Sequence, residues 1–292
     1  MTVRAAGRDL EVLVEGPDSG PVLLFHSGTP TAAVPNPEIS GPAAKRGLRT
    51  VAFSRPGYAT STPQRGRSVA DVVPDVEAIL DELGAERCVS IGWSGGGPHA
   101  LACAALLSER CSAVATMAAV APYPADGLDW LAGMGTDNLD EFGAALESEE
   151  ALTRYLERSA TELAGVTGEQ LGAALGGLVS DVDKAALTGE FADVLAEAFR
   201  RAVSTGIAGW RDDDLAFVRP WGFELSSIRV PVAVWQGDQD RMVPFAHGRW
   251  LAAHVHGARP HLLEGDGHLS LVHHIDRILD DLMQVAGLSS IA

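Results

Sequence analysis

A serine with glycine on both sides is the strongest chemical signal in this sequence, within the run Gly92-Trp93-Ser94-Gly95-Gly96. The apolar residues 88–91 before it predict a buried strand, and residues 98–107, rich in small side chains, predict a helix after it. A strand, a sharp glycine turn and a helix are typical of a turn that lifts a serine hydroxyl clear of a sheet. Pro98 fits this interpretation, because proline is tolerated in a helix's first turn. The helix would aim free N–H groups and its positive dipole end at the hydroxyl, where an anion is stabilised.

This serine needs a partner that takes its proton, because a hydroxyl is a poor nucleophile at neutral pH. Among nine histidines, His268 stands out because it lies in a glycine-containing loop between a predicted strand and a predicted helix. Such loops meet at the carboxyl edge of an α/β sheet, where sites form. His26 and His99 should lie near the serine, and we interpret them as packing or supporting groups. Five further histidines fall on predicted helices or their ends and are interpreted as surface or packing residues: His247, His254, His256, His273 and His274.

A carboxylate that orients the histidine should follow a strand at the same edge. Asp240 does so, and Asp238 and Asp266 are its alternatives. Asp238 comes directly after the glycine that ends the strand, and it more naturally bonds the backbone of its own turn. Asp266 stands so close to His268 in sequence that its carboxylate would hardly reach the far ring nitrogen. We therefore expect Asp240 to be the orienting carboxylate.

The charge that develops on a substrate carbonyl oxygen needs N–H donors aimed at it, which form an oxyanion hole. The N–H of Gly95, directly after the serine, is one expected donor. The second should come from the loop after the predicted strand at 22–25, where Gly28-Thr29-Pro30 lies. The loss of one such donor typically costs about 3 kcal/mol of transition-state stabilisation.

The elements that must position these groups alternate along the chain. Four apolar, strand-like runs lie at residues 22–25, 49–54, 88–91 and 112–120, and helical patterns separate the last three of them. This alternation predicts a mainly parallel sheet with helices on both faces, an α/β architecture. Strands at 230–235 and 259–263 then resume the pattern near the end of the chain.

The middle of the chain has a different character. Residues 122–225 carry no convincing strand, and two Glu- and Ala-rich stretches, 141–159 and 184–202, each predict an amphipathic helix. We interpret this segment as an inserted helical cap or lid, whose aromatic residues fill its own core and roof an apolar pocket. The chain then divides into a first core part, the cap and a second core part, at residues 1–121, 122–225 and 226–292.

Composition narrows the choice of partners. The net charge is −17, and residues 121–225 hold 20 acidic against 7 basic residues. Such a surface disfavours nucleic acid and anionic membranes, and we interpret the excess as a solvated helical face. No apolar run is long enough to span a bilayer and the N-terminus lacks the apolar part of a signal peptide, so we expect a cytoplasmic protein. We expect the three cysteines to be buried free thiols. Because the sequence lacks metal-binding and phosphate-binding motifs, we expect no cofactor.

The sequence resembles the α/β-hydrolase superfamily over nearly its whole length. Five motifs carry the resemblance: His26-Ser27-Gly28-Thr29-Pro30, Ser54-Arg55-Pro56-Gly57-Tyr58, Gly92 to Gly96, Gly237-x-x-Asp240 with Pro244, and Gly267-His268. The order Ser, Asp, His also matches. The resemblance implies Ser94 as nucleophile, Asp240 as orienting carboxylate, His268 as general base and acid, and Thr29 and Gly95 as oxyanion donors. Ser27 interrupts the usual His-Gly pair, which leaves Gly28 as the alternative to Thr29.

What this resemblance implies is an α/β-hydrolase fold and a serine hydrolase, most simply a carboxylesterase or lactonase with an apolar acyl or aryl group under the cap. Serine in place of aspartate at the turn argues against relatives that dehalogenate or open epoxides. A cofactor-free perhydrolase, haloperoxidase-like, or a C–C bond hydrolase would use the same residues. A binding protein that keeps the triad without turnover is a further alternative. Exposed aromatic residues on the cap would supply the contact of a possible homodimer.

Overall fold

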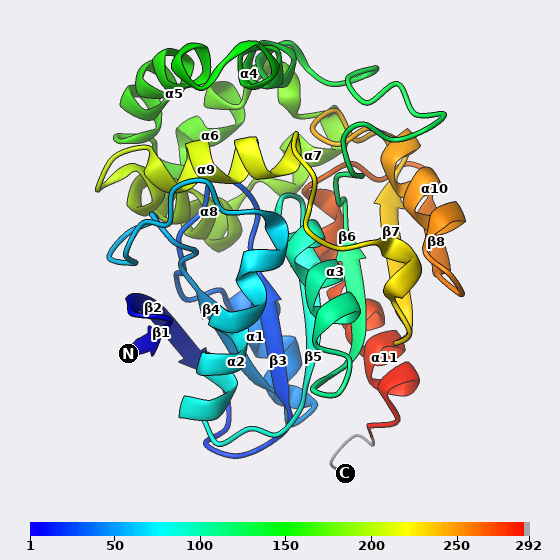
Figure 1. Ribbon diagram of the computed structural model, residues 1–292. Coiled ribbons are helices and arrows are strands. Elements are labelled where there is room, and N and C mark those ends of the chain that lie inside the picture. Colours follow the sequence, from blue (N-terminus) through cyan, green and yellow to red (C-terminus); the bar gives the residue numbers. More distant parts are fainter. Residues whose placement is uncertain (289–292) are drawn as a thin grey trace.

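The computed structural model describes residues 1–288, which form a central sheet of eight strands (Figure 1). The strand order is β1-β2-β4-β3-β5-β6-β7-β8; β1 and β2 pair antiparallel, and every pairing from β4 to β8 is parallel. The mainly parallel sheet is therefore confirmed. The strands are Thr2–Ala5 (β1), Arg8–Glu15 (β2), Val22–His26 (β3), Arg49–Phe53 (β4), Cys88–Trp93 (β5), Cys111–Met117 (β6), Val232–Gly237 (β7) and Arg259–Leu263 (β8).

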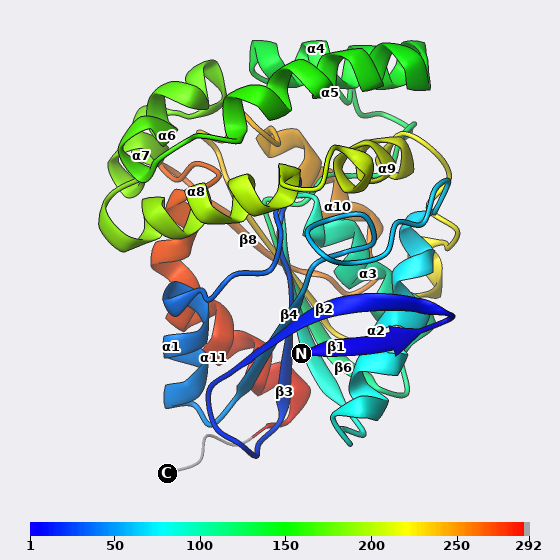
Figure 2. The ribbon, with the colours of Figure 1, turned by 90° about the vertical axis from the view of Figure 1, so that its left-hand side faces the viewer.

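Helices cover both faces of the sheet (Figure 2). Neighbouring residues of β3 serve different faces: Leu23 and Phe25 belong to one core cluster, and Val22 and Leu24 to the other. Burial on both faces explains why the strands are continuous apolar runs rather than alternating ones. On one face lie α1 (Pro37–Lys45) and α11 (Ile275–Ala286); on the other lie α2 (Val72–Glu82), α3 (Gly96–Leu106) and α10 (Phe245–His254). Helix α1 was not predicted, since its two prolines and one glycine hide any apolar period.

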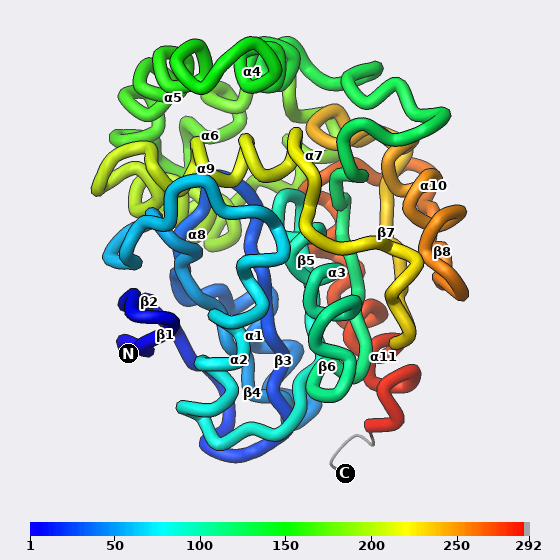
Figure 3. The backbone as a smooth tube through the Cα atoms, viewed as in Figure 1, coloured from blue at the N-terminus to red at the C-terminus, as the bar shows by residue number. Residues whose placement is uncertain are grey.

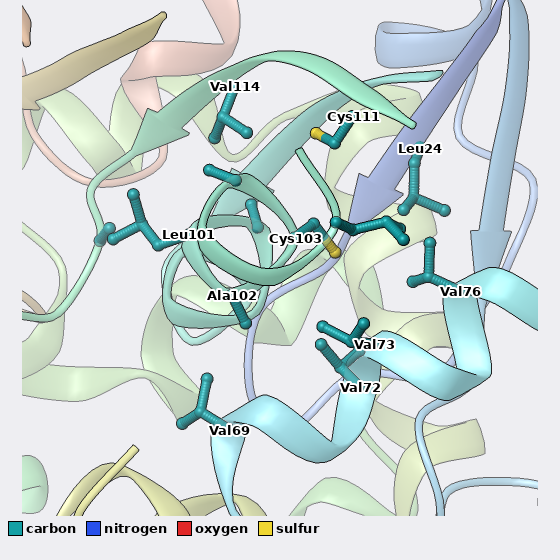
Figure 4. Close-up of a cluster of buried hydrophobic side chains, with 14 of the residues drawn as sticks. Leu24, Val69, Val72, Val73, Val76, Leu101, Ala102, Cys103, Cys111 and Val114 are labelled. Carbon is teal, nitrogen blue, oxygen red and sulfur yellow. The ribbon is translucent and has the colours of Figure 1, made fainter. Parts of the chain in front are cut away.

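The core between the sheet, α2 and α3 is built from short side chains (Figure 4). The valines of α2 belong to the same buried cluster as Leu101 and Cys103 of α3. All three cysteines of the chain are buried free thiols, as expected. Ahead of α2, Ser68 and Asp71 form a capping box around the short 3₁₀ turn Val69–Asp71. Pro74 then falls in the first turn of α2, where no backbone N–H bond is lost, so the helix is regular from Val72.

Six helices between β6 and β7 form a layer over the carboxyl ends of the strands (Figures 1 and 3). We call residues 136–217 the helical layer. Its helices are Thr136–Glu147 (α4), Glu149–Leu163 (α5), Gly168–Ala174 (α6), Asp181–Ala186 (α7), Gly189–Val203 (α8) and Ala208–Phe217 (α9). Along residues 1–288 no helix has the length and apolarity that crossing a membrane requires. Residues 289–292 of the predicted second core part lie outside the described residues.

Two stretches of this layer that were each predicted as one helix are each divided into two helices. The stretch 141–159 is divided between α4 and α5, because Ser148 takes an extended conformation and its hydroxyl accepts the N–H of Ala151 as the cap of α5. The stretch 184–202 is likewise divided between α7 and α8, with Thr188 in extended conformation at the N-cap position of the second helix and without a side-chain capping bond. In both places an extended residue interrupts the helix that the apolar pattern predicts.

The expectation of exposed aromatic residues on the cap was also wrong. Every aromatic side chain of the helical layer is buried or half-buried, and the exposed large apolar residues of the described chain are Met1, Leu106, Leu139, Leu146 and Leu262. The rings mainly fill the interior of the layer, and the homodimer stays a prediction.

Close packing of glycines at the end of β5 gives a test of the fold. A Cβ on Gly96 would overlap the carbonyl oxygen of His26, which is backbone and cannot move aside. We expect Gly96→Ala to lower the free energy of unfolding by about 1–3 kcal/mol or more, through overpacking. Urea unfolding followed by tryptophan fluorescence measures this.

Gly143→Ala is the matched control, because Gly143 lies on exposed helix α4 and a Cβ there meets nothing within 4 Å. Alanine should leave stability unchanged or raise it by up to about 1 kcal/mol. Equal unfolding midpoints for Gly96→Ala and the wild type would contradict the close approach of these backbones.

Candidate active site

Ser94 stands directly after β5, in a strained turn at the start of α3. Its φ of +55° lies in the left-handed region that non-glycine residues rarely adopt, as at other functional turns. Two backbone bonds hold the turn: Ser94 donates its N–H to Met117 O at 2.8 Å, and its carbonyl accepts the N–H of Gly97 at 2.9 Å. Ser94 is half-buried and lines a cavity of about 430 Å³.

His268 lines the same cavity and is bonded to Asp240. Its Nδ1 lies 2.9 Å from Asp240 Oδ2, and both side chains are almost fully buried. Asp240 is itself fixed, because Oδ1 accepts the N–H groups of Met242 and Val243 at 2.9 and 2.8 Å while Oδ2 accepts from Gln236 at 2.8 Å. The structure thus brings together two of the predicted residues, with Ser94 at the wall of the same cavity. Among residues 1–288 no hydrogen bond joins Ser94 to His268, and such bonds often tighten only with substrate.

Electrostatics around His268 favour its charged form. Burial would lower the pKa of His268, but the charge of Asp240 and its hydrogen bond outweigh burial and raise the pKa above the usual 6.5. A histidine with this pairing can accept a proton and hold it as an imidazolium.

The alternative carboxylates have other partners. Asp238 Oδ1 accepts the N–H of Gly265 at 2.8 Å and so closes the turn between β7 and β8. Asp266 lies 2.9 Å from His274 Nε2 and also accepts from the Ser270 hydroxyl at 3.2 Å.

The remaining histidines near the core are packing groups. His26 and His99 are buried under the site, and burial lowers the pKa of both rings, so they are neutral at neutral pH. His247 is held between Ala121 N and Trp130 O, and burial lowers its pKa to about 4. None of these three rings lines the cavity.

The expected oxyanion donors lie beside Ser94. Thr29 and Gly95 approach so closely that a Cβ on Gly95 would stand 2.5 Å from Thr29 Oγ1, and a Cβ on Gly28 would stand 3.3 Å from the Ser94 Cβ. Within residues 1–288 the N–H groups of Gly28, Thr29 and Gly95 donate to no protein group. The residues that carry these three N–H groups lie beside the serine, where a developing oxyanion would need donors.

A buried ion cluster supports the loop that carries Thr29, and its contacts join segments that lie far apart in the sequence. Arg55 donates to Ser27 O at 2.7 Å and to Gly28 O at 2.9 Å, and it pairs with Asp213 at 2.7 Å. Asp213, on α9, also accepts the Thr29 hydroxyl at 2.9 Å. Tyr58 and Arg67 complete its coordination. Burial would raise the pKa of Asp213, but the two arginines hold it well below its usual value.

A second buried aspartate supports the loop that carries His268. Asp183, at the start of α7, accepts the N–H of Leu269 at 2.7 Å and that of Ser270 at 3.0 Å. It also caps its own helix with Ser180. A Cβ on Gly267 would overlap its carboxylate, so the glycine before His268 makes room for it. The pattern Ser180-x-x-Asp183 is readable as a helix start, but its contact with a loop 86 residues away is not.

Comparisons with known proteins agree with this architecture. The profile of the alpha/beta hydrolase fold matches residues 21–274. The pimeloyl-[acyl-carrier protein] methyl ester esterase of Aromatoleum aromaticum is 29% identical over 247 residues, which cover 80% of this chain and 85% of that protein. The bifunctional esterase/perhydrolase DCH of Acinetobacter calcoaceticus is 26% identical over 233 residues, 79% of this chain and 78% of that protein. The crystallised alpha/beta hydrolase fold protein of Nakamurella multipartita is 26% identical, with a TM-score of 0.63 over 98% of this chain and 99% of that one.

The Asp183 contact predicts a local effect on the His268 loop. In Asp183→Ala the N–H groups of Leu269 and Ser270 lose a buried acceptor, which should lower the free energy of unfolding by about 1–3 kcal/mol. Hydrogen exchange should show selective loss of protection at these two amides. Asp181→Ala, which alters a fully exposed aspartate on the same helix, should leave both readings unchanged. Unaltered protection in Asp183→Ala would show that the carboxylate does not hold this loop.

Proposed function

Because this chain belongs to the alpha/beta hydrolase fold family, as its motifs predicted, we propose that it is a serine hydrolase that cleaves a carboxylic ester or lactone through an acyl-enzyme on Ser94. One observation carries the proposal: a buried histidine, His268, bonded to Asp240, lines the same cavity as a serine held in a strained turn beside free backbone N–H groups. The esterase relatives, at 26–29% identity, support the same bond type.

Each residue of the site has a defined role in this mechanism. His268 Nε2 takes the proton of the Ser94 hydroxyl as its Oγ attacks the substrate carbonyl carbon. The N–H groups of Gly95 and Thr29 stabilise the oxyanion. Asp240 keeps the proton on His268 Nδ1 and stabilises the imidazolium, which then protonates the departing alkoxide. Water, deprotonated by the same ring, releases the acid and restores Ser94.

The cavity supports an apolar stem on the substrate. Aromatic side chains from β3, β5 and the helical layer line it: Phe25, Trp93, Phe142, Tyr155, Phe199, Trp210 and Phe217. A volume of about 430 Å³ is in the range of small-molecule sites. An acyl or aryl group of moderate size therefore fits beneath the helical layer.

A perhydrolase reaction is the second candidate, favoured by the similarity to a bifunctional esterase/perhydrolase. It would use hydrogen peroxide in place of water at the acyl-enzyme and release a peracid. Product analysis with and without peroxide separates the two reactions.

A series of p-nitrophenyl esters of increasing acyl length tests the acyl-enzyme. We expect steady turnover in the wild type and a fall of about 10⁴-fold or more in Ser94→Ala, because the nucleophile is lost. His268→Ala and Asp240→Asn should also lose activity, and the losses should not add, since the three residues act as one unit. Asp238→Asn, which alters only the neighbouring turn, is the control and should be much milder. A single burst that stalls in the wild type would instead indicate a binding protein.

The raised pKa of His268 sets the direction of the pH profile. Only the neutral ring can accept the Ser94 proton, so kcat/KM should rise with pH through a midpoint above 6.5. In Asp240→Asn the charge that raises this pKa is gone, and the midpoint of the residual activity should move to lower pH. Rates between about pH 5 and pH 9 on one ester measure both midpoints. A wild-type midpoint at or below 6.5, or an unmoved midpoint in the variant, would oppose this assignment.

A further inference from the structure

The wall of the cavity carries an unbalanced set of charges. Five carboxyl side chains line it, and among the described residues that line it there is no lysine or arginine: Glu15, Asp137, Glu141, Glu162 and Asp214. His268 is the single basic side chain there, and it is already paired with Asp240. The cavity is therefore built to repel anions and to attract cations.

Asp214 is the fully buried residue in this set, and no N–H or hydroxyl donor of residues 1–288 bonds its carboxyl. A proton shared with the neighbouring carboxyl of Glu141 can serve one of its oxygens, and a donor from a ligand in the cavity would serve the other. Asp214 thus points to a ligand group that is a strong donor.

Glu141 lies next to Asp214 and forms a pair with it. The indole N–H of Trp210, on α9, donates to Glu141 Oε1 at 2.8 Å. This bond holds the carboxyl of Glu141, on α4, beside α9. Burial raises the pKa of both carboxyls, and the pKa of Asp214 is raised further by the neighbouring charge of Glu141. Two acids this close hold a proton between them until a cation arrives.

The nearby arginines do not serve this pair. Arg55 and Arg67 both bond Asp213, whose side chain points toward the loop that carries Thr29. Neither arginine bonds Asp214 or Glu141. Among residues 1–288 no cation therefore bonds this pair, although the charge of Arg67 lies close enough to oppose the rise in the pKa of Asp214.

We propose that Asp214 and Glu141 form a subsite for a protonated amine, so that the substrate is an ester or lactone with an ammonium group on its apolar stem. An ammonium offers three donors and a positive charge, which match two acceptor carboxyls. The rings of Tyr155, Trp210 and Phe217 line the same cavity and give faces on which an alkylammonium is also favourable. This inference rests on the proposed hydrolase function.

Three p-nitrophenyl esters of equal length test the subsite: 6-aminohexanoate, heptanoate and the monoester of adipic acid. Their stems end in ammonium, methyl and carboxylate. We expect kcat/KM to be about tenfold or more higher for the ammonium than for the methyl ester, and lowest for the carboxylate. Rates with Ser94→Ala supply the background, including any cyclisation of the amino ester. An equal or reversed order, with turnover intact, would overturn the subsite and leave the hydrolase function standing.

Asp214→Asn and Glu141→Gln should each reduce the ammonium-to-methyl ratio severalfold, chiefly through KM. Because the ratio compares two substrates on one variant, a general loss of fold or activity does not alter it. Asp140→Asn, an exposed aspartate beside Glu141 on α4, is the matched control and should keep the wild-type ratio. Ratios unchanged in both variants would overturn the assignment of the two carboxyls.

Calorimetric titration of Ser94→Ala with n-hexylammonium and with n-hexanol keeps the subsite testable if no ester is turned over. If none of the three esters is turned over, that result counts against the hydrolase function alone. Tighter binding of hexylammonium than of hexanol, weakened by Asp214→Asn in the same background, supports the subsite independently. Equal binding of the two would overturn it.

Discussion

Burial of charge beneath the helical layer is the constraint on which the site depends. A carboxylate removed from water must be paired or hydrogen-bonded, and Asp213 and Asp183 both lack exposed surface. Asp213 meets this need through Arg55 and the Thr29 hydroxyl, and Asp183 meets it through backbone N–H groups just after His268. Each aspartate thereby fixes a loop of the core. The helical layer is part of how the site is held, and more than the roof of its pocket.

Asp240 is fixed in the same way, because both of its carboxyl oxygens are hydrogen-bonded. Its two oxygens accept two backbone N–H groups, one amide of Gln236 and the ring of His268, so the carboxylate has a single orientation. Preorganised groups of this kind need no rearrangement when charge develops, which is the main electrostatic advantage of a closed site. The glycines at the start of α3 extend this fixed geometry to the backbone, because the segment from His26 to Thr29 leaves no room for a side chain at Gly95 or Gly96.

Local signals made the sheet, the serine turn and the Gly267-His268 loop predictable, because glycine turns and apolar runs report on a few neighbouring residues. Contacts between distant segments left no such trace. The run Asp212-Asp213-Asp214 was included in an acidic excess interpreted as a solvated face, yet all three side chains are buried. Helix caps at Ser148 and Thr188 were likewise hidden inside continuous apolar patterns. What decides these features is which group lies opposite in space, and order along one chain does not give it.

Helix α9 joins the support of the reaction centre to the wall of the pocket. Successive residues of a helix point about 100° apart, so Asp213 turns to the loop of Thr29 while Asp214 turns to the cavity. A group bound at Asp214 would be held by the same helical turn that positions the loop beside Ser94. Binding energy from a remote part of a substrate can then serve the geometry at the reacting carbonyl. Helix α9 thus contributes both to substrate specificity and to the position of the Thr29 loop. Substitutions in this turn should therefore change both.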